Sequence, residues 1–248
     1  MSNTSDYKFK GQKHSSGSAR YKHIYYGDVS WWHVIKTELI ITLFGWIPGA
    51  LGLGLRSIFF RFIFAEIGHK TVFGKDITIR HPSKIKLGSN VVIDDNCVLD
   101  AKGEDNDGIT IGNNVFIGRN TIIYCKNGSI WLEDEVNLSS NCQVFSSNQL
   151  TIGRGTMVGA YSYFLSGGEY DINDPTPFAQ QSGMKTKGEL TVGANTWIGA
   201  RVTVLDAASI GENCVIGAGS VVNKPIPPYT LALGVPAKPI RNLKQQPE

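Results

Sequence analysis

A six-residue period constrains the fold of this chain more than any other feature. An isoleucine, leucine or valine followed by glycine or another small residue returns every six positions, as in Ile111-Gly112 and Ile117-Gly118. About eighteen such units keep the same phase. A fixed short period of this kind is typical of stacked β-solenoids. The sequence therefore predicts an all-β fold, a single-stranded parallel β-helix of about six coils with three units to a coil.

Two positions of each unit are predicted to face the inside of the coils. The first is the aliphatic residue, and the second is the small or β-branched residue four positions later. Stacked coils bury such residues as continuous ladders. The predicted small inward residues are Val91, Cys97, Val115, Thr121, Val136, Cys142, Thr156, Val202, Ala208, Cys214 and Ser220.

The cysteines follow the same repeat. Three of the four, Cys97, Cys142 and Cys214, occupy small inward positions, and Cys125 is the fourth. We interpret them as packed core thiols rather than as a disulfide or zinc framework. Cysteines that remain unpaired thiols fit a reducing cytoplasm.

Interruptions of the period all follow the third unit of a coil. The longest predicts a protruding loop at about residues 165–188. Because a coil stack accepts insertions only at its corners, all of these loops are expected along one edge of the fold. Loops gathered in this way usually line the functional face.

Composition and length divide the chain into four parts. Its 248 residues, 42% hydrophobic and 18% charged, suffice for one sizeable domain with an appendage. We expect a mobile polar segment at 1–30, an apolar helical cap or membrane-contacting segment at 31–66, the β-helix at 67–226 and a C-terminal extension at 227–248. The net charge of +3, without clustered basic and aromatic residues, argues against nucleic-acid binding.

The segment 39–55 carries no charge. Its 17 residues are at the short limit for a membrane span, and a proline and four glycines argue against a straight one. Two interpretations stay open: helices that only cap the β-helix, or a cap that also contacts a membrane peripherally. Trp31 and Trp32, with Arg56 and Arg61, suit the second interpretation.

The C-terminal sequence resembles a known family. Val192 to Ala200, Ile210 to Tyr229 and Gly234 to Arg241 are similar to the left-handed β-helix hexapeptide acyltransferases. The likeness is strongest to maltose/galactoside acetyltransferases and to bacterial O-acetyltransferases of polysaccharide biosynthesis. It covers about residues 70–242. It implies left-handed coils, a homotrimer, active sites between adjacent subunits and acetyl-CoA as co-substrate, without a required metal.

The resemblance also implies which residues bind CoA. Some positions flank the thioester and the pantetheine arm, and three cations lie near the phosphates, where positive charge is needed. For each residue, packing of the repeat or a solvated basic tail is the alternative. The positions are Trp197, Gly199, Ala200, Gly217, Ala218, Lys224, Lys238 and Arg241.

In related sequences a histidine at the start of the long loop takes the proton from the acceptor hydroxyl. The matching position here is Glu169, and no histidine follows His81. Burial between subunits is one way for a carboxylate to serve as this base. Like-charge coupling of Asp171 and Asp174 is expected to raise their pKa values in the same way. The positions expected to bind the acceptor are Ser139, Asn141, Tyr163, Tyr170 and Asp171.

Three functional interpretations remain. The first is an acetyltransferase acting on a hydroxyl, or an amine, of a sugar or glycan precursor with Glu169 as base. The second is an inactive form, natural or engineered, in which glutamate replaces histidine, and the third is a scaffold that binds CoA or a partner without turnover. A γ-type carbonic anhydrase needs three zinc-binding histidines around the coils, which this chain does not supply. With membrane contact, the protein would work at the inner face of the membrane on a lipid-linked saccharide.

Overall fold

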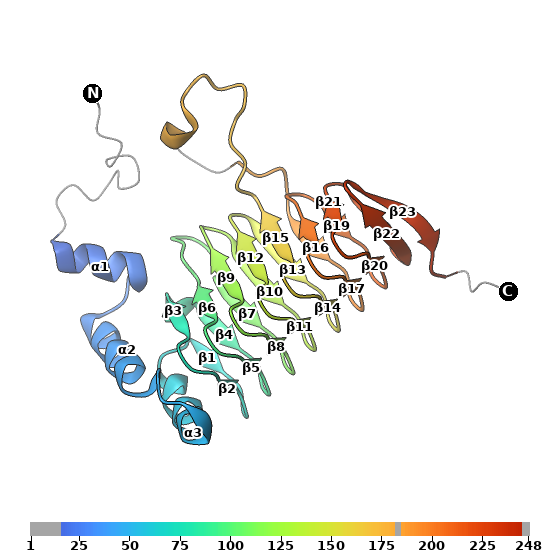
Figure 1. The fold of residues 1–248 in the computed structure, drawn as a ribbon. Coiled ribbons are helices and arrows are strands. Elements are labelled where there is room, and N and C mark those ends of the chain that lie inside the picture. The colour runs from blue at the N-terminus through green and yellow to red at the C-terminus, as the bar shows by residue number, and fades with distance from the viewer. Residues whose placement is uncertain (1–15, 182–184, 245–248) are drawn as a thin grey trace.

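The computed structural model describes residues 16–181 and 185–244. They form a left-handed parallel β-helix, a prism of three sheets, with helices at its N-terminal end (Figure 1). Each turn of the chain contributes one strand to each sheet, so strand pairing is parallel throughout the coils.

The strands are short, two to four residues in the coils. Sheet A contains β1 (Glu66–Ile67), β4 (Ile85–Leu87), β7 (Ile109–Ile111), β10 (Ser129–Leu132), β13 (Gln149–Ile152), β16 (Leu190–Val192) and β19 (Ser209–Ile210). Sheet B contains β2 (Val72–Phe73), β5 (Val92–Ile93), β8 (Phe116–Ile117), β11 (Asn137–Leu138), β14 (Met157–Val158), β17 (Trp197–Ile198), β20 (Val215–Ile216), β22 (Thr230–Gly234) and β23 (Ala237–Asn242). Sheet C contains β3 (Thr78–Arg80), β6 (Val98–Asp100), β9 (Ile122–Cys125), β12 (Gln143–Ser146), β15 (Tyr163–Ser166), β18 (Thr203–Val204) and β21 (Val221–Val222).

The number of coils exceeds the predicted six. Seven complete coils are present, and β22 adds an eighth row to sheet B before β23 turns back antiparallel. The prediction omitted the first coil, β1 to β3. Its sheet B strand carries Phe73 at the inward position in place of an aliphatic residue. The cap covers this ring, since Phe60 and Phe64 pack at 5.3 and 5.5 Å from it.

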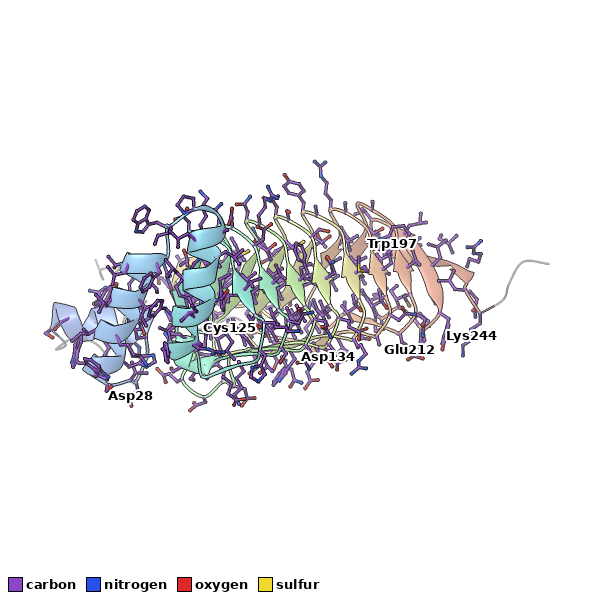
Figure 2. The ribbon with its side chains drawn as sticks, turned by 90° about the horizontal axis from the view of Figure 1, so that it is seen from below. Asp28, Cys125, Asp134, Trp197, Glu212 and Lys244 are labelled. Atoms are coloured by element: carbon purple, nitrogen blue, oxygen red, sulfur yellow. The ribbon has the colours of Figure 1, made fainter. Side chains whose placement is uncertain are left out.

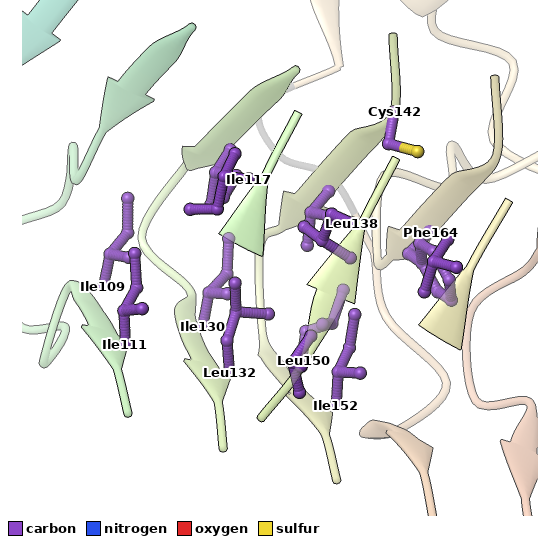
Figure 3. Packing of buried hydrophobic residues seen from close by; sticks show 14 of the residues in the cluster. Ile109, Ile111, Ile117, Ile130, Leu132, Leu138, Cys142, Leu150, Ile152 and Phe164 are labelled. Carbon is purple, nitrogen blue, oxygen red and sulfur yellow. The ribbon is translucent and has the colours of Figure 1, made fainter. Parts of the chain in front are cut away.

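The interior follows the predicted ladders. All eleven small inward positions are buried, and so are the aliphatic residues of the units. Figure 3 shows successive coils stacking Ile111, Leu132 and Ile152 in one row and Ile117 and Leu138 in another. Burial of this continuous apolar core is the main stabilising contribution to the fold.

The corners use a feature that the sequence analysis did not predict. The residue just before most small inward residues has a positive φ, as in Asn90, Asn114 and Asn141. Asparagine accounts for eight of the 16 non-glycine residues with positive φ in the described ranges. Asparagine tolerates the left-handed region because its short side chain can hydrogen-bond locally. Here it also bonds across coils, since Asn90 Nδ2 donates to Asn114 Oδ1 at 2.8 Å.

The N-terminal cap consists of α2 (Trp31–Phe44), α3 (Gly49–Phe59) and the 3₁₀ turn η2 (Phe60–Phe62). The Ser30 hydroxyl caps α2 by accepting a hydrogen bond from His33 N. Buried Arg56 fixes α3 to the prism by donating to the carbonyl oxygens of Phe73, Phe44 and Ile47. The helical cap predicted from the sequence is therefore present. Within the described ranges no helix is both long and apolar enough to cross a bilayer.

An additional helix, α1 (Gly17–Tyr25), lies in the segment expected to be mobile. It is attached to the prism because His81 N donates to Tyr25 O at 2.8 Å. It is attached to α2 because Tyr26, just after it, donates to Glu38 at 2.6 Å. Residues 1–15 of the same expected segment lie outside the described residues.

Burial of the thiols predicts an alkaline loss of stability. Burial raises the pKa of Cys97 to about 12, and the pKa of Cys142 also lies above its usual range for the same reason. Below the ordinary thiol pKa of about 8.5, both states are protonated and the stabilisation is complete. Above it the unfolded chain ionises first, so stability falls until the folded thiols ionise. Thermal unfolding across this range should show the decline. A Cys97→Val variant, matching Val91 and Val115, should decline less steeply; an equal decline would contradict the assignment.

Candidate functional site

The residues that follow the sheet B strands form one corner of the prism, here called the B–C corner. Successive coils approach closely there, and at several positions, among them Gly159 and Gly199, glycine avoids a backbone contact. A Cβ on Gly159 would lie 2.5 Å from Ala200 N, and one on Gly199 would lie 2.6 Å from Ala218 N. Both contacts are to backbone, so neither can be relieved by a side-chain movement.

Five of the predicted CoA positions occur at this corner in two adjacent coils. Gly199 and Ala200 follow β17, and Gly217 and Ala218 follow β20. Trp197 lies on the outer face of sheet B just before the corner, and 62% of its side chain is exposed. This tryptophan is near the C-terminal end of the prism, opposite the cap (Figure 2). A large exposed ring beside a flat glycine-containing corner suits an extended ligand.

The predicted phosphate-binding cations divide between two places. Lys238 and Arg241 lie on β23, which pairs with β22 at the end of sheet B. Lys224 follows β21 and therefore lies across sheet C from the corner. Only the first two share sheet B with Trp197.

The residues that follow the sheet C strands form the C–A edge. It includes the 3₁₀ turn η3 (Pro82–Lys84) and the long loop, residues 167–189, which contains η4 (Phe178–Gln180). The loop projects away from the prism as the prediction required (Figure 1). Residues 182–184 within it lie outside the described residues.

Glu169 lies at the base of this loop. Its backbone pairs antiparallel with Lys185, and its carboxylate accepts a hydrogen bond from Lys187 Nζ at 2.5 Å. Lys185 Nζ forms a second ion pair, at 2.5 Å, with Asp171 Oδ2. These residues line an open cavity of about 660 Å³ together with Tyr170 and Phe178. Two carboxylates and two ammonium groups thus face one groove.

The pKa values of the loop aspartates contradict the expected like-charge coupling. The hydrogen bond from Lys185 holds the pKa of Asp171 below its usual range. The backbone N–H of Thr176 lowers that of Asp174. Each carboxylate is stabilised in its charged form by a donor of its own, and this outweighs their mutual repulsion.

Aromatic side chains lie on both sides of the site. Tyr170 and Phe178 pack edge to face in the loop with ring centroids 5.8 Å apart. Tyr163 lies on the outer face of sheet C, and burial beside Tyr124 raises its pKa to about 12. Tyr124 also packs on Phe145 at 4.7 Å. Sheet C therefore carries an aromatic cluster between the corner and the loop, in which Tyr124 and Tyr163 are half-buried and Phe145 is buried.

Two of the residues expected to bind the acceptor lie at the B–C corner, one coil before the coil in which the loop begins. Ser139 and Asn141 lie between β11 and β12. Asn141 has a positive φ and accepts a hydrogen bond from Asn120 Nδ2 at 3.3 Å. Within one chain, Ser139 and Asn141 lie at the same corner as the predicted CoA positions. Glu169, Tyr170 and Asp171 lie on the other side of sheet C, at the C–A edge.

The sequence analysis missed Asp206, which fastens the base of the long loop. This buried residue follows β18, one coil after the loop begins. Its carboxylate accepts from Gly167 N at 2.6 Å and from Lys187 N at 2.5 Å, and the Thr186 hydroxyl lies at 3.2 Å. One side chain thus holds both ends of the loop that carries Glu169. An acidic residue two positions after a third strand is the signal that could have identified it.

The described histidines lie at the N-terminal end. His81 is buried, and its two ring nitrogens face Asp100 Oδ1 at 3.0 Å and His23 O at 3.4 Å. Burial lowers the pKa of His33 on α2. Residue 14 lies outside the described ranges. His81 joins α1 to the prism, and both of its nitrogens are occupied there. Among the described residues, no three histidine, cysteine or acidic side chains converge as a metal site would require.

Two family models match the coils. Residues 190–224 match the bacterial transferase hexapeptide (six repeats), and residues 108–146 match the hexapeptide repeat of succinyl-transferase. Both models describe hexapeptide repeats of transferases, and both matches lie within the β-helix of this chain. The first match spans every predicted CoA position except Lys238 and Arg241.

Relatives of this hexapeptide-repeat chain are named as acetyltransferases. A putative acetyltransferase of Staphylococcus aureus is 37% identical over 46% of this chain and 65% of its own length. One of Schizosaccharomyces pombe is 40% identical over 43% of this chain and 49% of its own length. The chain thus spans less than two thirds of the length of these relatives.

Solved structures agree with the fold. A variant of AntD, an N-acyltransferase from Bacillus cereus in complex with dTDP and coenzyme A, matches with a TM-score of 0.52 and 25% identity. The match covers 74% of this chain and 87% of AntD. The polySia-specific acetyltransferase NeuO matches with a TM-score of 0.53 and 20% identity, over 72% of this chain and 83% of its own, which shows the shared fold alone.

Proposed function

We propose that this chain is a CoA-dependent acyltransferase that transfers an acetyl group from acetyl-CoA to a hydroxyl or amine of a sugar or glycan precursor, as in polysaccharide biosynthesis. The stack of Trp197, Gly199, Ala200, Gly217 and Ala218 at one corner carries the proposal. The relatives named as acetyltransferases support acetyl as the group transferred. The AntD complex supports coenzyme A as the carrier and an amino group as a possible acceptor type.

In the proposed reaction the acceptor lies in the loop groove. Its O–H or N–H gives the proton to a Glu169 carboxylate oxygen while the oxygen or nitrogen attacks the thioester carbonyl. A backbone N–H of the B–C corner stabilises the oxyanion. The C–S bond then breaks, and the proton passes from Glu169 to the CoA sulfur. The products are an acetyl ester or amide and free CoA. Lys187 orients the carboxylate through its ion pair.

The distance between the CoA positions and the loop base within one chain supports a site shared between subunits, as in the proposed homotrimer. Sheet C separates the corner from the loop base, and β15 spans four residues, roughly 13 Å at about 3.3 Å per residue. Direct transfer needs reacting atoms about 3–3.5 Å apart. In our proposal the loop of one subunit therefore reaches the B–C corner of its neighbour. We place the reaction in the cytoplasm, where acetyl-CoA and sugar precursors are available.

One observation favours a second candidate, a CoA-binding protein without turnover. Glu169 is partly exposed and already paired with Lys187. To take the acceptor proton, this carboxylate oxygen has to give up the hydrogen bond that it accepts from Lys187. Binding of CoA is common to both candidates, so it is tested first.

Replacing Trp197 with alanine is expected to weaken CoA binding about tenfold or more, because the exposed ring would lose its contact with the ligand. The Trp197→Ala variant should be as stable as the parent protein, since the exposed ring contributes little to the core. Met157→Ala is the matched control, because Met157 pairs with Trp197 in sheet B and is 50% exposed. Isothermal titration with acetyl-CoA measures the Kd of the parent protein and of both variants. Absence of CoA binding by the parent protein would refute both candidate functions.

A further inference from the structure

The cap exposes an apolar surface that the prism does not cover. Trp32 and Leu51 are 72% and 70% exposed. The helices that carry these side chains lie across the N-terminal end of the prism, with many side chains directed away from it (Figure 2). The exposed large apolar residues of the cap are Trp31, Trp32, Ile35, Leu39, Leu43, Trp46, Leu51, Leu53, Ile58 and Phe62. So many exposed large apolar side chains on two neighbouring helices indicate an interaction surface.

Helix α2 carries apolar residues both on its buried side and on an exposed side. Val34, Thr37 and Ile40 are buried toward the rest of the protein. On the other side, Trp31, Ile35, Leu39 and Leu43 recur every fourth residue, so they form one exposed stripe. An exposed apolar stripe opposite a buried side indicates a second contact surface on this helix, which the described residues leave uncovered.

The lengths of the helices restrict the kind of contact. Helices α2 and α3 have 14 and 11 residues, whereas a span needs about 20. Short helices with an apolar side bind in the plane of a bilayer interface instead. Three of the five tryptophans of the chain, Trp31, Trp32 and Trp46, are exposed on this surface. Tryptophan is the residue type enriched at membrane interfaces.

Charge favours an anionic bilayer. Residues 17–66 contain five lysines and arginines against three carboxylates, of which Glu66 pairs with Lys86 of the prism at 3.3 Å. Among the cations only Arg56 is buried. Of the carboxylates, Glu38 accepts hydrogen bonds from Tyr21 and Tyr26. Lys22 lies 5.9 Å from the Trp31 ring centroid, which brings a cation to the edge of the apolar surface.

We propose that the cap docks on the surface of an anionic lipid bilayer, with α2 and α3 lying in the interface. The long loop begins in the fifth coil, four coil spacings from the cap, or roughly 20 Å at about 4.8 Å per spacing. If the acceptor is anchored by its lipid in the same membrane, its saccharide part would extend from the bilayer to the site. The docking does not depend on the proposed function. The inference that the acceptor is a lipid-linked saccharide rests on it.

Vesicle flotation of the full chain tests the docking. The protein is expected to float with vesicles of phosphatidylcholine and phosphatidylglycerol, and less with phosphatidylcholine alone. Replacing Ile35, Leu39 and Leu51 together with glutamine should lower the partition coefficient about a hundredfold or more. Arg61→Gln should lower it about fivefold on the anionic vesicles only. Ile240→Gln, an equally exposed substitution at the opposite end, should leave it unchanged.

Three outcomes would overturn the docking: no flotation with either vesicle, equal flotation of the triple variant and the parent, or a change of oligomeric state in the triple variant. The last would identify a second copy of the chain as the partner. Titration of the same proteins with acetyl-CoA separates this test from the proposed function. A chain that binds CoA but no vesicle refutes the docking alone, and the reverse refutes the proposed function alone.

Discussion

Replacing Glu169 with glutamine is expected to lower the rate of acetyl transfer by about 10²–10⁴ while leaving the Kd for acetyl-CoA unchanged. Glutamine keeps the size and hydrogen-bonding reach of the side chain but cannot accept the proton of the acceptor. The ion pair with Lys187 is lost as well. Because Glu169 is proposed to take the acceptor proton and is not among the proposed CoA-binding residues, donor binding should not respond. Transfer to a panel of sugars and amino sugars, with a CoA titration, measures both effects.

Glu189→Gln is the control, since Glu189 is exposed at the far end of the same loop. It should retain the parent rate. Full activity of Glu169→Gln would show that Glu169 is not the base. A Glu169→His variant distinguishes the two candidate functions. If histidine raises the rate by about two orders of magnitude at constant CoA affinity, the parent is an inactivated acyltransferase.

The fold was predictable because one physical requirement recurs in every coil. Only a small side chain fits beside an aliphatic one in the interior, so Val91, Cys97 and Val115 follow the same spacing and all are buried. The first coil was missed where Phe73 replaced the aliphatic residue and its ring partners came from the cap. Such a contact joins residues that are far apart in the sequence, so a six-residue period does not predict it.

The site was less predictable because its residues come from different coils. The resemblance pointed to Glu169, but its pairing with Lys187 depends on how the loop folds back. The approach of Gly199 to Ala218 N likewise depends on the spacing of coils. This contact gives Gly199 a structural reason to be glycine, independent of CoA. Trp197 is the more informative CoA position, because the fold leaves its ring exposed.

Replacing Asp206 with alanine is expected to release the long loop. Hydrogen bonds to a charged group contribute about 1.5–3 kcal/mol each. Two backbone N–H groups, of Gly167 and Lys187, would lose their acceptor. We expect the loop to lose at least about 3 kcal/mol of stabilisation, which raises the population of open loop about a hundredfold. Acetyl transfer should fall with it, because Glu169 would no longer be held.

Limited proteolysis within residues 167–188 and amide hydrogen exchange measure the opening. The coils themselves should keep their protection, since Val204 and Ile210 on either side remain buried in the ladders. Asp206→Asn is the graded control: its amide oxygen can accept from one of the two N–H groups, so its loop should open less. Equal protection of the loop in Asp206→Ala and the parent would show that Gly167 and Lys187 find other acceptors. The loop base would then be held by the Glu169 and Lys185 backbone pair alone.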